Sequence, residues 1–298
     1  MQKLNFINLN KKIYYYLWED VEQIKGIIQI SHGMCEYAER YDNIAKFFNK
    51  HGYVVVADDH RGHGHTDEDN LGYAHGDMAD DTVKDMFELL KITKKMYPSK
   101  KYILFGFSYG SFLTQKFLEK YSNYLDGVVV AGSSKNSKLA VKFGKFITKM
   151  NLIFKRNQKK AYFVKKMTFD RYDKNFKDKC FLSNNQKSNQ KYYSDKFCGF
   201  VCSYNFYYSF FKMLDSLYKK KNVKNINKNL SILIVSGKND PVGQMGNGVK
   251  KLYNYYKKIG LKNIKLILYP NARHEFFNEI ESEKKLLDIV NFCNNVNI

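Results

Sequence analysis

Short apolar runs alternate with amphipathic segments over the first 132 residues of the chain. Runs rich in β-branched residues, as expected of strands buried on both faces, occupy 26–30, 53–57, 102–105 and 127–130. Apolar residues at helical spacing occupy the intervening segments 41–51, 80–96 and 111–121. Strands that alternate with helices in this way predict a mostly parallel sheet wrapped by helices.

The alternation stops at Ser133 and returns after Lys228. The stretch between them is rich in lysine, asparagine and aromatic residues and shows helical segments but no convincing strand. Beyond it the pattern predicts strands at 230–235 and 264–269 and helices at 243–259 and 280–293. A chain of 298 residues is near the upper limit for a single hydrophobic core. We therefore predict an α/β core formed by residues 1–132 and 229–298, with a helical insertion at 133–228.

The net charge of +21 is concentrated in this insertion. Residues 133–228 hold 24 Lys+Arg against 5 Asp+Glu, a surplus of 19, whereas the rest of the chain holds 26 against 24. The same stretch contains twenty Phe and Tyr residues. This mixture favours contact with an acyl chain and with phosphate or an anionic membrane surface. A solvated, lysine-rich helical surface is the alternative interpretation.

The five cysteines are scattered and odd in number, which is unlike the even framework of small disulfide-rich domains, so we expect reduced thiols. Cys198 and Cys202 lack a second Cys/His pair nearby that would complete a zinc site. The N-terminus lacks the apolar segment of a signal peptide, and no run approaches the roughly 18 apolar residues of a membrane span. These features predict a cytoplasmic protein.

Residues 106–110 read Gly-Phe-Ser-Tyr-Gly, a G-x-S-x-G pattern directly after a predicted strand and before a predicted helix. In a nucleophile elbow both glycines are needed, because the turn is too tight for side chains there. Such a turn raises the serine hydroxyl clear of the sheet edge. We therefore predict that Ser108 is a nucleophile, with an ordinary strand-to-helix turn as the alternative.

A serine hydroxyl needs a base to accept its proton, and an acid must hold that base in one tautomer. In enzymes with this elbow the chain order is serine, then an acid after a late strand, then histidine after the last strand. Asp240 and His274 follow the last two predicted strands in this order. The sequence thus predicts Ser108, Asp240 and His274 as a catalytic triad. An Asn-Asp-Pro turn and a solvated or helix-capping histidine are the alternatives.

Acyl transfer also requires N–H donors for the oxyanion that develops on the carbonyl oxygen. One is the backbone N–H that follows the nucleophile, here that of Tyr109. The other comes from the loop after the third strand of the fold, where we select Met34 because Gly33 lets the backbone turn its N–H inward.

Residues 60–65 contain three histidines, which raises the question of a metal site. The segment follows a strand and contains two glycines, so we favour a structural turn near the pocket. No metal and no organic cofactor is expected. Cys35, beside the oxyanion loop, is interpreted as a small apolar filler.

Four motifs now point to one family: His32–Glu36 with Arg40-Tyr41, Asp59–Gly64, the serine elbow, and Asp240–Val242 paired with Tyr269–His274. With them the chain resembles the monoacylglycerol lipase and lysophospholipase group of α/β hydrolases, grouped with the S33 serine aminopeptidases. The resemblance implies the α/β-hydrolase fold, a mostly parallel eight-stranded sheet flanked by helices with a helical lid after the sixth strand. It also implies Ser108, Asp240 and His274 as catalytic residues, and Met34 and Tyr109 as oxyanion donors.

The elbow departs from the group in one respect. Members usually have histidine before the nucleophile and methionine after it, where this chain has Phe107 and Tyr109. Donation by the Tyr109 N–H should survive, but we expect the walls of the acyl pocket to differ.

The predicted function is hydrolysis of a lipid-like ester, such as a lysophospholipid or a monoacylglycerol, through an acyl-enzyme. An S33-type aminopeptidase is the competing enzyme, but it needs carboxylates to hold the substrate's ammonium group. The insertion offers only Asp170, Asp173, Asp178, Asp195 and Asp215. A non-catalytic basic binding module is the third alternative; no nucleic-acid recognition motif is present, so a nucleic-acid partner is not expected.

Overall fold

A single sheet of eight strands, in the order β1-β2-β4-β3-β5-β6-β7-β8, organises the computed structural model, which describes residues 1–296. The strands are β1 (Gln2–Asn8), β2 (Lys11–Trp18), β3 (Gly26–Ser31), β4 (Tyr53–Asp58), β5 (Lys101–Phe107), β6 (Gly127–Ala131), β7 (Ser231–Gly237) and β8 (Ile264–Tyr269). Strands β3 to β8 run parallel to one another, whereas β2 pairs antiparallel with both β1 and β4 at one edge. This confirms the predicted mostly parallel sheet of an α/β hydrolase.

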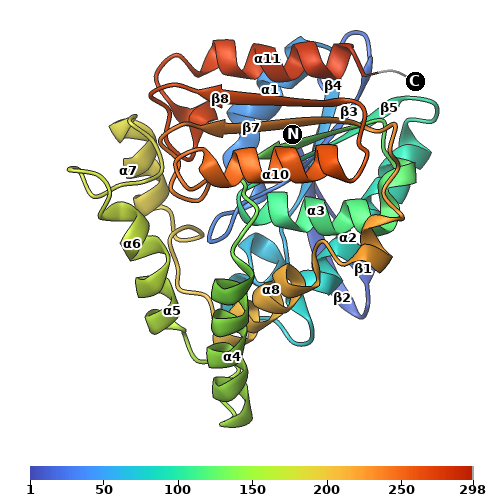
Figure 1. Cartoon of the computed structure of the whole chain (residues 1–298). Helices are drawn as coiled ribbons and strands as arrows, with labels where there is room; N and C mark the ends of the chain where they lie inside the picture. The colour runs from blue at the N-terminus through green and yellow to red at the C-terminus, as the bar shows by residue number, and fades with distance from the viewer. Residues whose placement is uncertain (297–298) are drawn as a thin grey trace.

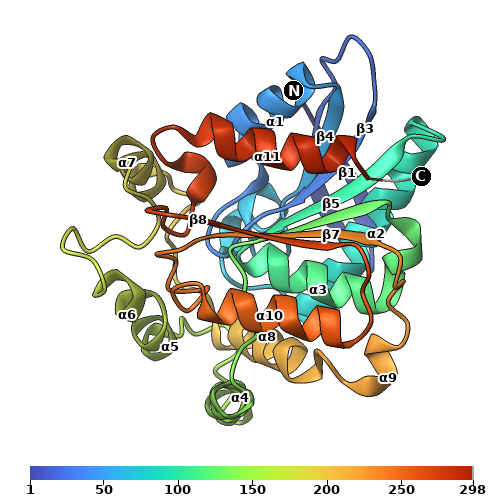
Figure 2. The ribbon, with the colours of Figure 1, turned by 45° about the horizontal axis from the view of Figure 1, so that its top comes forward.

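Helices cover both faces of the sheet (Figures 1 and 2). Helices α1 (Asp42–Lys50) and α11 (Ser282–Asn294) bury their apolar residues on one face. Helices α2 (Met78–Met96), α3 (Tyr109–Tyr121) and α10 (Asn247–Lys258) pack on the other face. The sheet therefore separates two hydrophobic cores, because its central strands are buried on both sides.

Two features differ from the hydrophobic pattern. The pattern predicts six of the strands individually but neither β1 nor β2. In the edge strand β1 the apolar Ile7 is 75% exposed while Leu4 and Phe6 are only partly buried, so apolar residues do not mark one buried face. Helix α10 begins at Asn247 rather than at Gly243, because Gln244 and Met245 have positive φ values of 54° and 51° and form a turn. That prediction of the helix start is wrong by four residues.

The segment between β6 and β7 is helical. Its described helices are α4 (Lys138–Ile153), α5 (Tyr162–Met167), α6 (Phe169–Asp173), α7 (Gln186–Ser194), α8 (Tyr204–Ser216) and α9 (Lys220–Val223). Helix α8 packs on both α2 and α4, while α6 and α7 lie beside the carboxyl ends of β7 and β8 (Figure 1). Within residues 1–296, every helix is too short or too polar to span a bilayer.

The packing of α3 on the sheet gives a stability prediction. Phe117 of α3 is completely buried, so Phe117→Ala should lower the free energy of unfolding by about 3–5 kcal/mol through lost burial and a residual cavity. Phe146→Ala removes an equal side chain that is 61% exposed on α4, and should change stability by about 0.5 kcal/mol or less. Urea denaturation followed by circular dichroism measures both. Equal losses in the two variants would contradict this packing.

Candidate active site

Ser108 lies in a sharp turn between β5 and α3, with φ of 52° and ψ of −119°. Neither flanking glycine could carry a side chain. A Cβ on Gly106 would lie 2.1 Å from Thr114 Oγ1, and one on Gly110 would lie 2.0 Å from the carbonyl oxygen of Ser31. Close packing of the turn against β3 and α3 therefore holds Ser108 in a left-handed conformation that a non-glycine residue rarely adopts.

The structure brings Ser108 and His274 together. His274, in the loop after β8, places Nε2 2.8 Å from Ser108 Oγ. Asp240, in the loop after β7, is fully buried, and its Oδ1 lies 2.9 Å from His274 Nδ1. The Nδ1–H direction is not aligned with that oxygen for a regular hydrogen bond, although the distance is short enough for one. Such contacts often align only once a substrate is bound.

The Asp240 carboxylate is held by two further donors. Its Oδ1 accepts a hydrogen bond from the Val242 N–H at 2.8 Å, and its Oδ2 accepts one from Ser236 Oγ at 2.9 Å. An ionised carboxylate can only accept, so the nitrogen of His274 that faces Asp240 is the one that carries hydrogen. The other nitrogen, Nε2, then directs a lone pair at the Ser108 hydroxyl, and this arrangement can remove its proton.

Met34 and Tyr109 both line the space above Ser108. Among residues 1–296 neither of their backbone N–H groups donates a hydrogen bond. The absence of a side chain on Gly33 is required here, because a Cβ would lie 2.4 Å from Glu36 Oε1 and 3.3 Å from Ser108 Cβ. Two residues whose backbone amides are unpaired within residues 1–296 thus line the same cavity as Ser108.

Three buried histidine rings hold the turn that contains Met34. His32 Nε2 accepts a hydrogen bond from the His60 N–H at 3.0 Å, and His63 Nε2 accepts one from the Cys35 N–H at 3.2 Å. Burial lowers the pKa of all three imidazoles, so they are neutral at physiological pH. No group of three or more His, Cys, Asp or Glu side chains within residues 1–296 is arranged to hold a metal ion.

His60 also contacts Asp58 at the end of β4. Its Nδ1 lies 2.7 Å from Asp58 Oδ2, and its Nε2 lies 2.9 Å from Ser31 Oγ. Burial raises the pKa of Asp58 to about 8 and lowers the pKa of His60 to about 3. The pair is therefore uncharged at neutral pH, with the proton on the carboxyl group, and this avoids the cost of burying two charges under the site.

A second buried network joins the Met34 turn to the loop of His274. Glu36 accepts hydrogen bonds from the Gly33 N–H at 2.5 Å and from the Tyr41 hydroxyl at 2.9 Å, and it pairs with Arg40. Arg40 in turn binds both carboxylate oxygens of Glu275 at 3.0 and 3.1 Å. Motif analysis includes Glu36 and Arg40 but misses Glu275, whose position directly after His274 was the available signal.

The two carboxyl groups of this network respond differently to burial. Burial raises the pKa of Glu36. Burial also acts on Glu275, but the adjacent Arg40 guanidinium outweighs it and holds the pKa of Glu275 below its usual value. Arg40 therefore forms its ionic bond with the residue next to His274 and thereby fixes the loop of the base.

The insertion contributes backbone acceptors to the same loop. The N–H of His274 donates to the carbonyl of Phe181 at 3.3 Å, and that of Glu275 donates to the carbonyl of Leu182 at 2.7 Å. The ring of Phe181 also lies 5.4 Å from the His274 ring. Residues 181–182 therefore form part of the support for His274.

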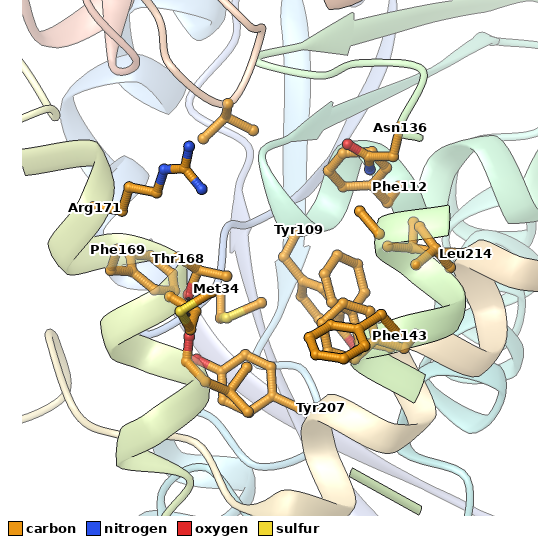
Figure 3. A pocket seen from close by; sticks show the side chains of 18 of the residues that line it. Met34, Tyr109, Phe112, Asn136, Phe143, Thr168, Phe169, Arg171, Tyr207 and Leu214 are labelled. Carbon is orange, nitrogen blue, oxygen red and sulfur yellow. Dashed lines mark hydrogen bonds between the residues drawn. The ribbon is translucent and has the colours of Figure 1, made fainter. Parts of the chain in front are cut away.

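Ser108 lines a cavity of about 370 Å³. Figure 3 shows this cavity and the side chains around it. Aromatic and aliphatic side chains from α3, α4, α5 and α8 form most of its wall, including Phe112, Phe143 and Leu214. Arg171 of α6 is its one charged lining residue among those described, and sequence reasoning missed it. Phe107 does not line this cavity. Its ring packs 4.7 Å from the ring of His274, so the phenylalanine that replaces the usual histidine before Ser108 affects the support of His274 and not the cavity wall. Tyr109, which replaces the usual methionine, does line the wall.

Comparison with known proteins places these observations in context. Residues 22–281 match the family model described as serine aminopeptidase, S33. The chain is 28% identical to the monoacylglycerol lipase of Mycolicibacterium smegmatis over 126 residues, 42% of this chain and 44% of that protein. It is 31% identical to the monoglyceride lipase homolog of Monkeypox virus over 105 residues, 34% of this chain and 36% of that protein. These matches span less than half the length of each relative.

Solved structures are similar over nearly the whole chain. A thermostable carboxyl esterase from Bacillus coagulans in complex with glycerol superposes with a TM-score of 0.89 at 25% identity, covering 99% of this chain and 98% of that one. A soluble variant of monoglyceride lipase from Saccharomyces cerevisiae, in complex with a substrate analog, gives a TM-score of 0.76 at 18% identity, covering 100% and 95%. The second likeness concerns the fold alone.

The elbow geometry predicts the effect of a single methyl group. Gly110→Ala should lower the free energy of unfolding by about 3 kcal/mol, because its Cβ would collide with the backbone of β3. Gly260→Ala is the matched control: its φ is +91° but its Cβ would meet nothing within 4 Å, so it should cost only about 1 kcal/mol of backbone strain. Chemical denaturation of both variants measures the two losses in free energy of unfolding. A Gly110→Ala protein as stable as the Gly260→Ala protein would refute the collision.

The Asp58–His60 pair predicts a dependence of stability on pH. The pKa of Asp58 is about 8 in the folded protein, against an ordinary value of 3.8. Between these two values the folded protein keeps a proton that the unfolded chain loses, so the free energy of unfolding is highest below pH 3.8 and falls as pH rises toward 8. Asp58→Asn cannot ionise. Between pH 6.5 and 8 the wild-type protein should therefore lose about 2 kcal/mol relative to this variant, and the relative change should level off about one pH unit above the folded-state pKa of about 8, once Asp58 is ionised in the folded protein as well. Parallel pH curves of unfolding free energy for the two proteins would contradict the assignment.

Proposed function

Because the chain belongs to the S33 serine aminopeptidase family of α/β hydrolases, we propose that it hydrolyses a carboxylic ester of a lipid-like substrate through an acyl-enzyme. The observation that carries the proposal is the 2.8 Å contact between Ser108 Oγ and His274 Nε2 below an apolar cavity. A hydroxyl on a strained turn, a base and a buried acid are the components that acyl transfer requires.

The first half of the proposed reaction forms the acyl-enzyme. Ser108 Oγ attacks the ester carbonyl while His274 Nε2 accepts the hydroxyl proton. Asp240 stabilises the imidazolium that results, and the N–H groups of Met34 and Tyr109 stabilise the oxyanion. The tetrahedral intermediate collapses when His274 returns the proton to the leaving alcohol, so the C–O bond to the alcohol breaks and the acyl group stays on Ser108.

The second half releases the acid. A water molecule gives its proton to His274 Nε2 and attacks the acyl carbonyl. The same two amides bind the second oxyanion, and its collapse expels Ser108, which regains its proton from His274. The products are a free fatty acid and the regenerated enzyme, and neither step uses a metal or an organic cofactor.

The walls of the cavity favour an acyl chain as the bound group. Phe112, Phe143 and Leu214 present apolar surface beside Ser108, and burial of each methylene of an acyl chain contributes about 0.8 kcal/mol. Monoacylglycerols and lysophospholipids each carry one such chain, and both remain candidate substrates under this proposal. The insertion, residues 133–228, acts as a lid in this view because it supplies most of the wall.

A peptidase is less well supported. An aminopeptidase needs a carboxylate that faces the substrate, but no Asp or Glu among the described residues lines the cavity. The aspartates of the insertion all have other partners: Asp170 pairs with Lys165, Asp173 accepts from Phe181, Asp178 binds Arg273, Asp195 accepts from Tyr37, and Asp215 pairs with Lys145. A non-catalytic basic module would have no use for the contact between Ser108 and His274.

Contact with an anionic membrane surface is a further part of the proposal. Helix α4 exposes Leu139, Phe143, Phe146 and Ile153, each at least 60% accessible, and it also carries lysines. Apolar side chains that insert among lipids, together with cations that meet acidic headgroups, are the features of an interfacial helix. The lid would then receive its substrate from the membrane surface.

The nucleophile is tested by substitution. Ser108→Ala should abolish labelling by a fluorophosphonate probe and lower kcat for p-nitrophenyl hexanoate about a thousandfold or more, because the base then has no hydroxyl to activate. Ser216→Ala on α8 is the matched control, since its hydroxyl binds only the carbonyl of Met213, and it should keep both signals. Labelling that persists in the Ser108→Ala protein would end the proposal.

A further inference from the structure

Arg171 is unusual among the arginines of the chain. Only five of the 50 cationic residues are arginine. The guanidinium groups of Arg40, Arg61 and Arg273 each bind a carboxylate, and that of Arg156 binds the side-chain oxygen of an asparagine. For Arg171, no hydrogen bond or ion pair of the guanidinium is found among residues 1–296. A planar, permanently charged donor without a protein partner is available to bind a ligand.

The position of Arg171 directs this charge into the cavity. The residue belongs to α6, and its guanidinium points into the open centre of the pocket (Figure 3). The acids nearest in sequence are engaged, because Asp170 pairs with Lys165 and Asp173 accepts a hydrogen bond from the Phe181 N–H. With no acid in the described cavity wall, the positive charge facing the substrate is uncompensated.

Tyr172, the next residue of α6, contributes a second donor to the wall of the same cavity. It lines the cavity, and its hydroxyl makes no hydrogen bond with other residues of the described chain. Burial, with a smaller contribution from the charge of Asp240, raises the pKa of Tyr172 to about 12. The phenol therefore keeps its proton at neutral pH and can donate a hydrogen bond but not compensate the charge of Arg171.

The two sides of the cavity differ in chemistry. Arg171, the charged lining residue, lies on one side in Figure 3, beside the apolar Phe169. Phe112, Phe143 and Leu214 lie on the opposite side, where Asn136 is the polar residue labelled. An ester whose carbonyl is at Ser108 would place its acyl chain along the apolar side. Its alcohol part would then lie toward Arg171.

We propose that Arg171 and the Tyr172 hydroxyl form a subsite for a phosphate on the alcohol part of the ester, so that acylated glycerophosphates are preferred over neutral monoacylglycerols. A guanidinium binds two phosphate oxygens through parallel N–H···O bonds, and the phenol donates to a third. This inference rests on the proposed function and selects between its two candidate substrates.

The test compares esters that share one acyl chain. The wild-type protein and Arg171→Gln are assayed with 1-octanoyl-glycerol and 1-octanoyl-glycerol 3-phosphate, both below the concentration at which they aggregate, so that partition onto a surface plays no part. Arg171→Gln should lower kcat/KM for the phosphate ester about tenfold to a hundredfold, mainly through KM, because a charged hydrogen-bond partner is lost. The neutral ester should change by less than about twofold, and Arg171→Lys should recover only part of the loss, because lysine lacks the bidentate geometry.

Lys174→Gln is the matched control. It removes one positive charge from an exposed residue at the end of α6 that does not line the cavity. If it lowers kcat/KM for the phosphate ester as much as Arg171→Gln does, the general charge of the lid is responsible and the subsite is refuted. An equal loss on the neutral and the phosphate ester in Arg171→Gln refutes it as well.

Binding without turnover separates this inference from the proposed function. In a Ser108→Ala background, isothermal titration with 1-octanoyl-glycerol 3-phosphate should show a Kd that Arg171→Gln weakens about tenfold or more. Glycerol 3-phosphate, which lacks the acyl chain, should bind far more weakly, and equal affinity would assign the subsite to free phosphate instead. Failure of the wild-type protein to hydrolyse p-nitrophenyl octanoate would overturn the proposed function. The titration measures the contribution of Arg171 to phosphate binding whether or not the protein turns over an ester.

Discussion

The close approach of three backbone segments at Ser108 is the constraint on which the site depends. The elbow can bring a hydroxyl to the carboxyl edge of the sheet only if the chain reverses within a few residues, and this requires contact between the backbone at Gly110 and that of β3. The same contact brings the Met34 turn, which follows β3, beside the serine. Ser108, Met34 and Tyr109 are thus positioned by one packing event, and His274 and Asp240 are added by the loops after β8 and β7.

Many polar side chains are buried around this contact, but they carry little net charge. The rings of His32 and His63 are neutral and accept hydrogen bonds from backbone N–H groups, and the neutral ring of His60 contacts the side chains of Asp58 and Ser31, so all three act as fixed dipoles near the Met34 turn. Arg40 then contacts Glu36 on one side of the site and forms its ionic bond with Glu275 on the other. Polar groups that are already oriented need little reorganisation as charge develops in a reaction, which is the usual source of electrostatic stabilisation in enzymes.

Much of the core could be predicted from the sequence, because buried parallel strands leave continuous apolar runs and the elbow needs glycine at fixed positions. The candidate residues Ser108, Asp240 and His274 were accessible from chain order alone, and the structure brings them within contact distance. The start of α10 could not be predicted from the sequence, because Gln244 and Met245 adopt positive φ values although neither is a glycine. Arg171 was inaccessible for a different reason: in a segment crowded with lysines, only the three-dimensional positions show which cation lacks a partner and faces the cavity.

The backbone bonds from residues 181–182 to the loop of His274 limit how the cavity can widen. That part of the insertion cannot move away as a rigid flap, because its departure would release the imidazole that it supports. Helix α6 is tied to the same residues, because Asp173 accepts a hydrogen bond from the Phe181 N–H. A change in cavity shape that leaves residues 181–182 in place would keep His274 beside Ser108.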